Sequence, residues 1–137
     1  MKDREFESSL TTTERMAFYG LNDAMLLAHS TARAAGWYTD PTTNQPVSRN
    51  FGEVIALMHS ELSEALEADR KGRTSDEHLP HLDPRAVEFA DCIIRIMDTA
   101  SALGLDVPRA VIEKNRYNMQ RNDHKVTARR GVGGKRY

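Results

Sequence analysis

Four carboxylates in the middle of the chain have the types and spacing of metal ligands. Glu61 and Glu64 lie three residues apart in "SELSEALE". Glu88 and Asp91 lie three residues apart in "VEFADCII". Each residue of an α-helix advances by about 100°, so side chains three apart project from the same face. Two such pairs on neighbouring helices can converge, and their mutual repulsion then requires a cation; oxygen ligands suit Mg²⁺ or Mn²⁺.

Exposure to solvent is the alternative explanation for any single pair of this kind. Glu67 has Arg70 and Lys71 three and four residues further on, which indicates ordinary surface ion pairs. The pair formed by Glu88 and Asp91 interrupts a nearly continuous apolar run, where a surface explanation is harder to sustain. We therefore expect the two acidic segments to face each other and to hold a metal ion.

A basic stripe follows the acidic pairs. Lys114, Asn118 and Arg121 lie at positions i, i+4 and i+7, so they share one face of a helix. Lysine and arginine bind phosphate oxygens, arginine in bidentate fashion. Residues 53–91 carry ten acidic and four basic groups, whereas residues 114–137 carry eight basic groups and one acidic group. This asymmetry favours a ligand with both metal and phosphate; mutual attraction of the two segments, or a solvated basic face, is the alternative.

Four helices are expected to position these groups, over about residues 13–35, 51–71, 84–103 and 107–121. Asp83 and Asp106 have the positions of N-caps, and Gly104 has that of a C-terminal cap. The sequence shows no strand pattern and no internal repeat. It therefore predicts an all-α, four-helix bundle in one domain, residues 1–121. A basic, glycine-containing tail follows, residues 122–137, which is expected to be ordered only if something docks it.

Composition excludes several classes of protein. The single cysteine, Cys92, excludes an intramolecular disulfide and a cysteine-based zinc site, and we expect it to be a small core residue. The net charge of −1 does not indicate binding to nucleic acid or to a membrane. No segment approaches the ~20 apolar residues of a membrane span, and the N-terminus does not resemble a signal peptide, so a cytoplasmic location is expected. Apolar residues on nearly every predicted helix predict pairing with another copy of the chain.

At the acidic pairs the sequence resembles the all-α nucleoside triphosphate pyrophosphohydrolases of the MazG-like superfamily. That superfamily includes dimeric dUTPases, dCTP pyrophosphatases and phosphoribosyl-ATP pyrophosphatases, and the resemblance covers residues 29–121. Its signature is Glu-Glu-x-x-Glu on one helix and Glu-x-x-Asp on the next, which "SELSE" and "EFAD" match in order and spacing. The one departure is Ser60, which stands where the first glutamate is expected and cannot replace a carboxylate base.

The resemblance implies a role for each group of residues. It implies binding of Mg²⁺, or of Mn²⁺, by Glu61, Glu64, Glu88 and Asp91. Of these, Glu64 is expected to activate the attacking water with help from Glu61. The resemblance implies phosphate contacts at Lys114, Asn118, Arg121 and Lys135, and a base pocket formed by His29, Trp37, Arg49 and Asn50. From the residues alone, a packing role for Trp37 and a structural, hydrogen-bonded role for His29 remain open.

The activity that the resemblance implies is hydrolysis of a (deoxy)nucleoside triphosphate to the monophosphate and pyrophosphate, which removes surplus or unwanted nucleotides. Homodimers or homotetramers are expected. A phosphoribosyl-ATP pyrophosphatase on the same scaffold is one alternative. A non-enzymatic helical oligomer that binds nucleic acid or protein through its basic tail is the other. The nucleic-acid version is not favoured, because the tail has a single aromatic residue, Tyr137, and no recognisable motif.

Overall fold

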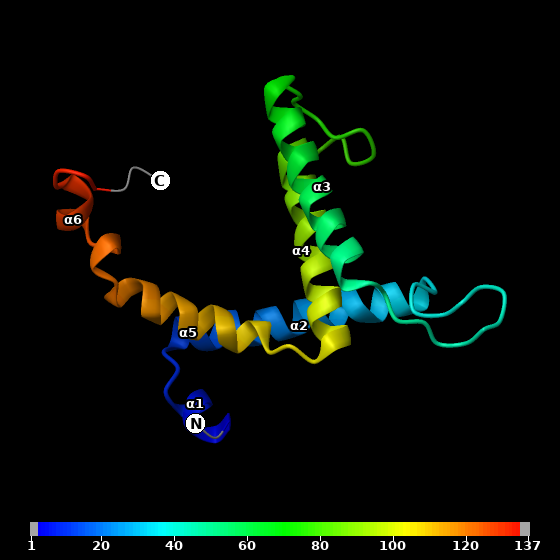
Figure 1. Ribbon diagram of the computed structural model, residues 1–137, viewed down its shortest axis with the longest axis horizontal. Helices are drawn as coiled ribbons and strands as arrows, with labels where there is room; N and C mark the ends of the chain where they lie inside the picture. Colours follow the sequence, from blue (N-terminus) through cyan, green and yellow to red (C-terminus); the bar gives the residue numbers. More distant parts are fainter. Residues whose placement is uncertain (1–2, 135–137) are drawn as a thin grey trace. The chain divides into compact units, whose positions relative to one another are not determined.

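The computed structural model describes residues 3–134, and over that range it is helical and has no β-strand. The elements are α1 (Asp3–Ser8), α2 (Thr12–Ala34), α3 (Phe51–Arg70), α4 (Pro84–Leu103), α5 (Val107–Gln120), the 3₁₀ turn η1 (Asn122–His124) and α6 (Val126–Arg130) (Figure 1). The predicted all-α class is confirmed. None of these helices is long and apolar enough to cross a membrane.

The predicted boundaries of the second and third helices are confirmed, and caps fix the starts of both and the end of α4. The Asp83 carboxylate accepts a hydrogen bond from the Arg85 backbone N–H at 2.9 Å, and Pro84 occupies the first turn of α4. Gly104 ends α4 with a φ of 65°, a conformation that favours glycine. Asn50, predicted for a base pocket, caps α3 by accepting from the Glu53 N–H at 3.1 Å, so its side chain has a structural role.

The helix α1 was not among the predicted helices, and η1 and α6 lie in the segment that was predicted to be a tail. These elements have six, three and five residues. Helices this short show less than two turns of apolar periodicity, so packing rather than pattern decides whether they form. In α1 that packing comes from Phe6, which is 2% exposed and lies in a small core with Leu10 and Ile112.

The chain divides into two compact units. One comprises residues up to 22 and from 106 onward, and the other comprises residues 23–105. In the first unit Arg116 donates two hydrogen bonds to Glu14, at 2.6 and 2.7 Å. These bonds, followed by a hydrogen bond from the Thr11 backbone N–H, lower the pKa of Glu14 to about 2. The predicted acidic pairs lie in the second unit, and the predicted basic stripe lies in the first.

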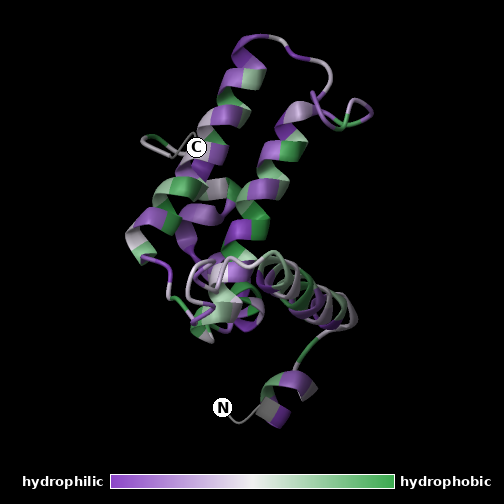
Figure 2. Ribbon diagram, turned by 90° about the vertical axis from the view of Figure 1, so that its right-hand side faces the viewer, coloured by the Kyte–Doolittle hydropathy of each residue, from purple (hydrophilic) through white to green (hydrophobic). Residues whose placement is uncertain are grey.

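An antiparallel hairpin of α3 and α4 forms the frame of the second unit (Figure 1). Val54 and Met58 of α3 pack against Cys92 of α4. Cys92 is 6% exposed, which confirms that it is a small core residue. Apolar and polar residues alternate along both helices (Figure 2), and the shared apolar stripe holds the acidic residues beside it at a fixed separation.

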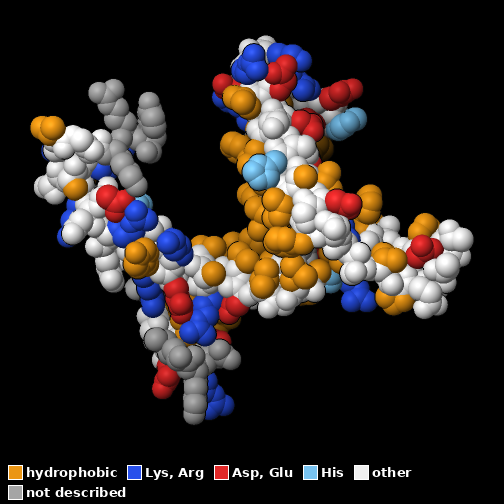
Figure 3. Space-filling view, in the orientation of Figure 1, with side chains coloured by type: hydrophobic (Ala, Val, Ile, Leu, Met, Phe, Trp, Pro, Cys, Tyr) orange, Lys and Arg blue, Asp and Glu red, His pale blue; other side chains and the backbone are white. Residues whose placement is uncertain are grey.

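Much of the hairpin's apolar surface remains exposed (Figure 3). Leu62 and Leu66 of α3 are 47% and 59% exposed, and Phe89, Ile93 and Ile94 of α4 are 51–52% exposed. Two helices bury too little area to form a complete core, and apolar faces of this kind are commonly covered by another chain. Pairing with a second copy stays a prediction.

Candidate functional site

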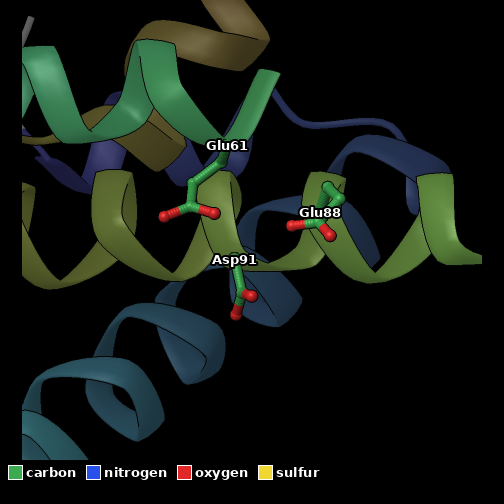
Figure 4. Close-up of side chains that lie close together, drawn as sticks. All are labelled: Glu61, Glu88 and Asp91. Carbon is green, nitrogen blue, oxygen red and sulfur yellow. The ribbon is translucent and has the colours of Figure 1, made fainter. Parts of the chain in front are cut away.

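Three carboxylates converge between α3 and α4. Glu61 reaches from α3 toward Glu88 and Asp91 on α4 (Figure 4). Each offers one oxygen, and these oxygens all lie within 4.8 Å of one another. Packing sets this arrangement. Met58 lies one turn before Glu61 on α3, and Cys92 follows Asp91 on α4; Met58 and Cys92 belong to the same hydrophobic core. The expectation that the two acidic segments face each other is confirmed for these three residues.

The three-carboxylate cluster fits a hard divalent cation. On an octahedral Mg²⁺ with oxygens at about 2.1 Å, neighbouring ligand atoms lie roughly 3 Å apart and opposite ones roughly 4.2 Å apart. Oxygens that are already within 4.8 Å reach those separations by small rotations of the side chains. Because all donors are carboxylate oxygens, the cluster could hold a metal ion of the class that includes Mg²⁺ and Mn²⁺.

Glu64, the fourth predicted ligand, lies outside the cluster. Its side chain is exposed, although its charge is close enough to help raise the pKa of Glu88. Asp76, in the loop between α3 and α4, is a fourth acid that sequence analysis missed. Its charge helps raise the pKa of both α4 carboxyls, while its own Oδ1 accepts backbone N–H groups from His78 and Leu79. Helical spacing gives no signal for a residue placed by a loop.

Ionisation of the two α4 carboxyl groups of the cluster is unfavourable. Burial is the main cause that raises the pKa of Glu88, followed by the charges of Glu64 and Glu61. Asp91 is exposed, but neighbouring protein groups still keep part of the surrounding water away from it. This desolvation raises the pKa of Asp91, with the charge of Glu61 adding to the effect and Arg95 opposing it. A bound cation would remove this repulsion, which is the electrostatic condition for a metal site.

Arg95 supplies the positive charge that the cluster lacks. Its Nε donates to Glu61 Oε1 at 2.7 Å. Glu61 is only 6% exposed, so this bond gives a buried carboxylate its counter-charge. Arg95 was not among the predicted site residues, although its position four residues after Asp91 places it on the same face of α4.

A second buried carboxylate, Asp98, contacts residues of the predicted base pocket. The Tyr38 hydroxyl donates to Asp98 Oδ1 at 2.8 Å, and His29 Nδ1 lies 2.8 Å from the same oxygen. The Arg49 guanidinium lies 3.6 Å from Oδ2. Burial, followed by the bond to Asp98, raises the pKa of Tyr38 to about 12, so this hydroxyl remains a donor. The structure thus brings the predicted His29 and Arg49 together, around two residues that sequence analysis missed.

Two cavities adjoin these groups. One, of about 360 Å³, is lined by His29, Tyr38 and Arg49 together with the apolar side chains of Phe51, Val54 and Leu103. The other, of about 440 Å³, is lined by Trp37, Arg49, Asp91, Arg95 and Asp98, among others. Trp37 is 63% exposed, which argues against a packing role, and the Arg49 guanidinium lies 5.7 Å from the centre of its ring.

The predicted phosphate-binding residues of α5 belong to the first unit. Lys114 and Asn118 line a cavity of about 460 Å³, and Asn118 Oδ1 is buried without a hydrogen-bond partner among residues 3–134. Arg121 is paired with Asp123 through Nε at 2.9 Å. Lys135 lies outside the described residues. Phosphate binding by these side chains stays a prediction.

Mg²⁺ should raise the melting temperature of the protein more at pH 8 than at pH 5. Because the pKa values of Glu88 and Asp91 are raised in the folded state, their contribution to stability is present below their unfolded-state pKa values. It is lost as the pH rises through the folded-state pKa values, so the metal-free protein is destabilised at neutral pH. Mg²⁺ at ten times its dissociation constant adds about 1.4 kcal/mol to the free energy of unfolding. This corresponds to a rise of roughly 4 °C in the melting temperature. Scanning calorimetry in Mg²⁺ and in EDTA measures this difference.

The double variant Glu88→Gln/Asp91→Asn is the control for this measurement. It removes both titrating groups and two of the three cluster ligands. We expect its melting temperature to be insensitive to Mg²⁺ at both pH values. An equal shift at pH 5 and pH 8 in the unaltered protein, or a shift retained in the double variant, contradicts the assignment of the cation to this cluster.

A comparison of the chain with protein-family models, with curated proteins and with solved structures found no match. The functional assignment therefore depends on the chemistry of the three-carboxylate cluster and of the cavities beside it.

Proposed function

We propose that this protein is a Mg²⁺-dependent nucleoside triphosphate pyrophosphohydrolase. One observation carries the proposal. Asp91 belongs to the three-carboxylate cluster and also lines the 440 Å³ cavity, whose wall includes Arg49, Arg95 and Trp37. This cavity thus combines a metal-binding edge with two guanidinium groups suited to phosphate oxygens. Arg49 also lines the 360 Å³ cavity, whose apolar side chains suit a base.

The roles of the residues follow from these positions. Glu61, Glu88 and Asp91 hold Mg²⁺, which supplies charge neutralisation at the phosphate oxygens. Arg95 and Arg49 bind phosphate oxygens of the same substrate from the cavity wall.

A water molecule attacks the α-phosphorus. Its oxygen forms the new P–O bond, and the bond from the α-phosphorus to the bridging oxygen of the β-phosphate breaks. Glu64, exposed and electrostatically close to the cluster, accepts the proton of the water, and pyrophosphate leaves.

The departure at Ser60 is compatible with this assignment. The Ser60 hydroxyl donates to the Leu57 carbonyl at 2.7 Å, so it bonds the backbone of its own helix. The role of base therefore falls to a neighbouring carboxylate, Glu64. The resemblance of "SELSE" and "EFAD" to the MazG-like signature supports the same reaction class.

Pyrophosphate release from a panel of canonical and modified nucleoside triphosphates, in Mg²⁺ and in EDTA, tests the proposal. We expect release from one or a few nucleotides in Mg²⁺ and none in EDTA. Phosphoribosyl-ATP belongs in the same panel, because release from it alone assigns the site to the alternative substrate. Orthophosphate as the product, or no turnover of any substrate by the folded protein, contradicts cleavage between the α- and β-phosphates.

A further inference from the structure

Asp98 is a buried charged group that the proposed reaction does not use. It is 4% exposed and lies seven residues after Asp91, two turns further along α4. Burial of a carboxylate costs several kcal/mol unless hydrogen bonds and opposite charges compensate it. The compensation comes from three residues far away in the sequence: His29, Tyr38 and Arg49. Such an arrangement holds partner side chains in one orientation.

The hydrogen bonds of Asp98 determine where His29 carries its proton. Asp98 Oδ1 already accepts the Tyr38 hydroxyl, and the Arg49 guanidinium faces Oδ2. The carboxylate is therefore an acceptor toward His29 Nδ1 at 2.8 Å, and the hydrogen-bond pattern assigns the imidazole proton to Nδ1. In the neutral ring this leaves Nε2 with a lone pair.

His29 also lines the 360 Å³ cavity, so Nε2 is the ring nitrogen left for an occupant of that cavity. A lone pair at this position accepts a hydrogen bond and gives none. The apolar side chains of Phe51, Val54 and Leu103 complete a wall suited to a flat ring. An aromatic ring with an N–H donor on its edge satisfies both features.

We propose that Asp98 is a positioning residue that holds His29 in the Nδ1–H form, so that the cavity selects the nucleobase edge that donates an N–H to Nε2. The choice of a nucleobase as the occupant rests on the proposed function. The tautomer itself does not, because it follows from contacts within the protein.

Nitrogen-15 NMR of the histidine rings tests the positioning role in the full chain. We expect the two ring nitrogens of His29 to show a protonated Nδ1 and an unprotonated Nε2. His59, exposed on α3, is the internal control. An unprotonated Nδ1 at His29 in the unaltered protein overturns the proposal, and this result requires no variant and no enzymatic activity.

The variant Asp98→Asn extends the test. Arg49 favours the amide oxygen on its own side, so the amide NH₂ faces His29 and donates to Nδ1. We expect His29 to switch to the Nε2–H form. Tyr38→Phe keeps the carboxylate and removes one donor, so it should leave the Nδ1–H form unchanged and stands in if Asp98→Asn does not fold. If folded Asp98→Asn keeps His29 in the Nδ1–H form, the carboxylate does not control the tautomer. Loss of the Nδ1–H form in Tyr38→Phe contradicts that control as well.

Binding of nucleoside monophosphates tests the selection. For the base preferred in the substrate panel, we compare the nucleotide with an analogue whose edge N–H groups are replaced by N-methyl or C–H. We expect the analogue to bind the unaltered protein about tenfold more weakly, the effect of one lost hydrogen bond. The difference should disappear in Asp98→Asn while its melting transition persists. Equal binding of nucleotide and analogue by the unaltered protein overturns the selection. If the protein releases no pyrophosphate from any nucleotide, the NMR result on the His29 tautomer still stands. The proposed activity and the positioning role of Asp98 can therefore be contradicted independently.

Discussion

Replacing Glu61 by glutamine should lower the rate of pyrophosphate release by about 10²–10³-fold. It weakens the hold on the cation that neutralises charge at the reacting phosphate, and loss of one preorganised electrostatic contact there has effects of this size. Glu61 is the one residue that α3 contributes to the three-carboxylate cluster, and it is 6% exposed. The amide keeps the shape of the side chain, and its oxygen can still accept from Arg95 Nε. The fold should therefore persist, while both kcat and the dependence of the rate on Mg²⁺ fall. Initial rates over a Mg²⁺ titration measure this.

Glu67→Gln is the matched control, because it makes the same change on the same helix. Glu67 forms the surface ion pair with Lys71, at 3.0 Å, that its spacing predicts. Both side chains are about half exposed or more, and such pairs contribute about 0–1 kcal/mol. We expect no change in rate. If the two variants behave alike, or if Glu61→Gln keeps its Mg²⁺-dependent turnover, Glu61 is not a metal ligand.

The hairpin that carries the site could be predicted from the sequence because its signals are local. Apolar periodicity and the caps at Asp83 and Gly104 define α4 within a residue. The spacing of Glu88 and Asp91 then places both carboxylates on one face. Spacing cannot decide between Glu61 and Glu64, which lie only about 60° apart on their helix. The burial of one and the exposure of the other depend on the packing of α3 against α4.

The Asp98 network could not be predicted in the same way. Its hydrogen bonds join Asp98 to Tyr38, 60 residues away, and to His29, 69 residues away, so no local pattern reports them. One signal was available on the helix itself. Asp91, Arg95 and Asp98 lie at i, i+4 and i+7, and three charged residues on one face of an otherwise apolar helix indicate a polar interior surface. That signal predicts a network but not its partners.

Replacing Arg95 by methionine should destabilise the metal-free protein by about 1–3 kcal/mol, because the buried carboxylate of Glu61 loses its counter-charge. Mg²⁺ should restore much of this loss, since the cation and the guanidinium neutralise the same carboxylate. Turnover should stay low even in Mg²⁺, because a phosphate contact of the cavity wall is gone. Denaturant unfolding in EDTA and in Mg²⁺, together with pyrophosphate release, separates the two effects.

Arg85→Met on the same helix is the control for charge removal. Arg85 pairs with Asp69 and Asp83 at exposed positions, so its loss should change stability little, and equally in EDTA and in Mg²⁺.

The double variant Glu61→Gln/Arg95→Met gives the decisive comparison. It removes the unpaired charge that Arg95→Met leaves behind, so in EDTA it should be more stable than Arg95→Met alone. Its stability should also respond less to Mg²⁺, because one cluster ligand is gone. If Mg²⁺ does not restore the stability of Arg95→Met, the cation and the guanidinium do not share Glu61. The three-carboxylate cluster would then be an ion-pair network of the hairpin rather than a metal site.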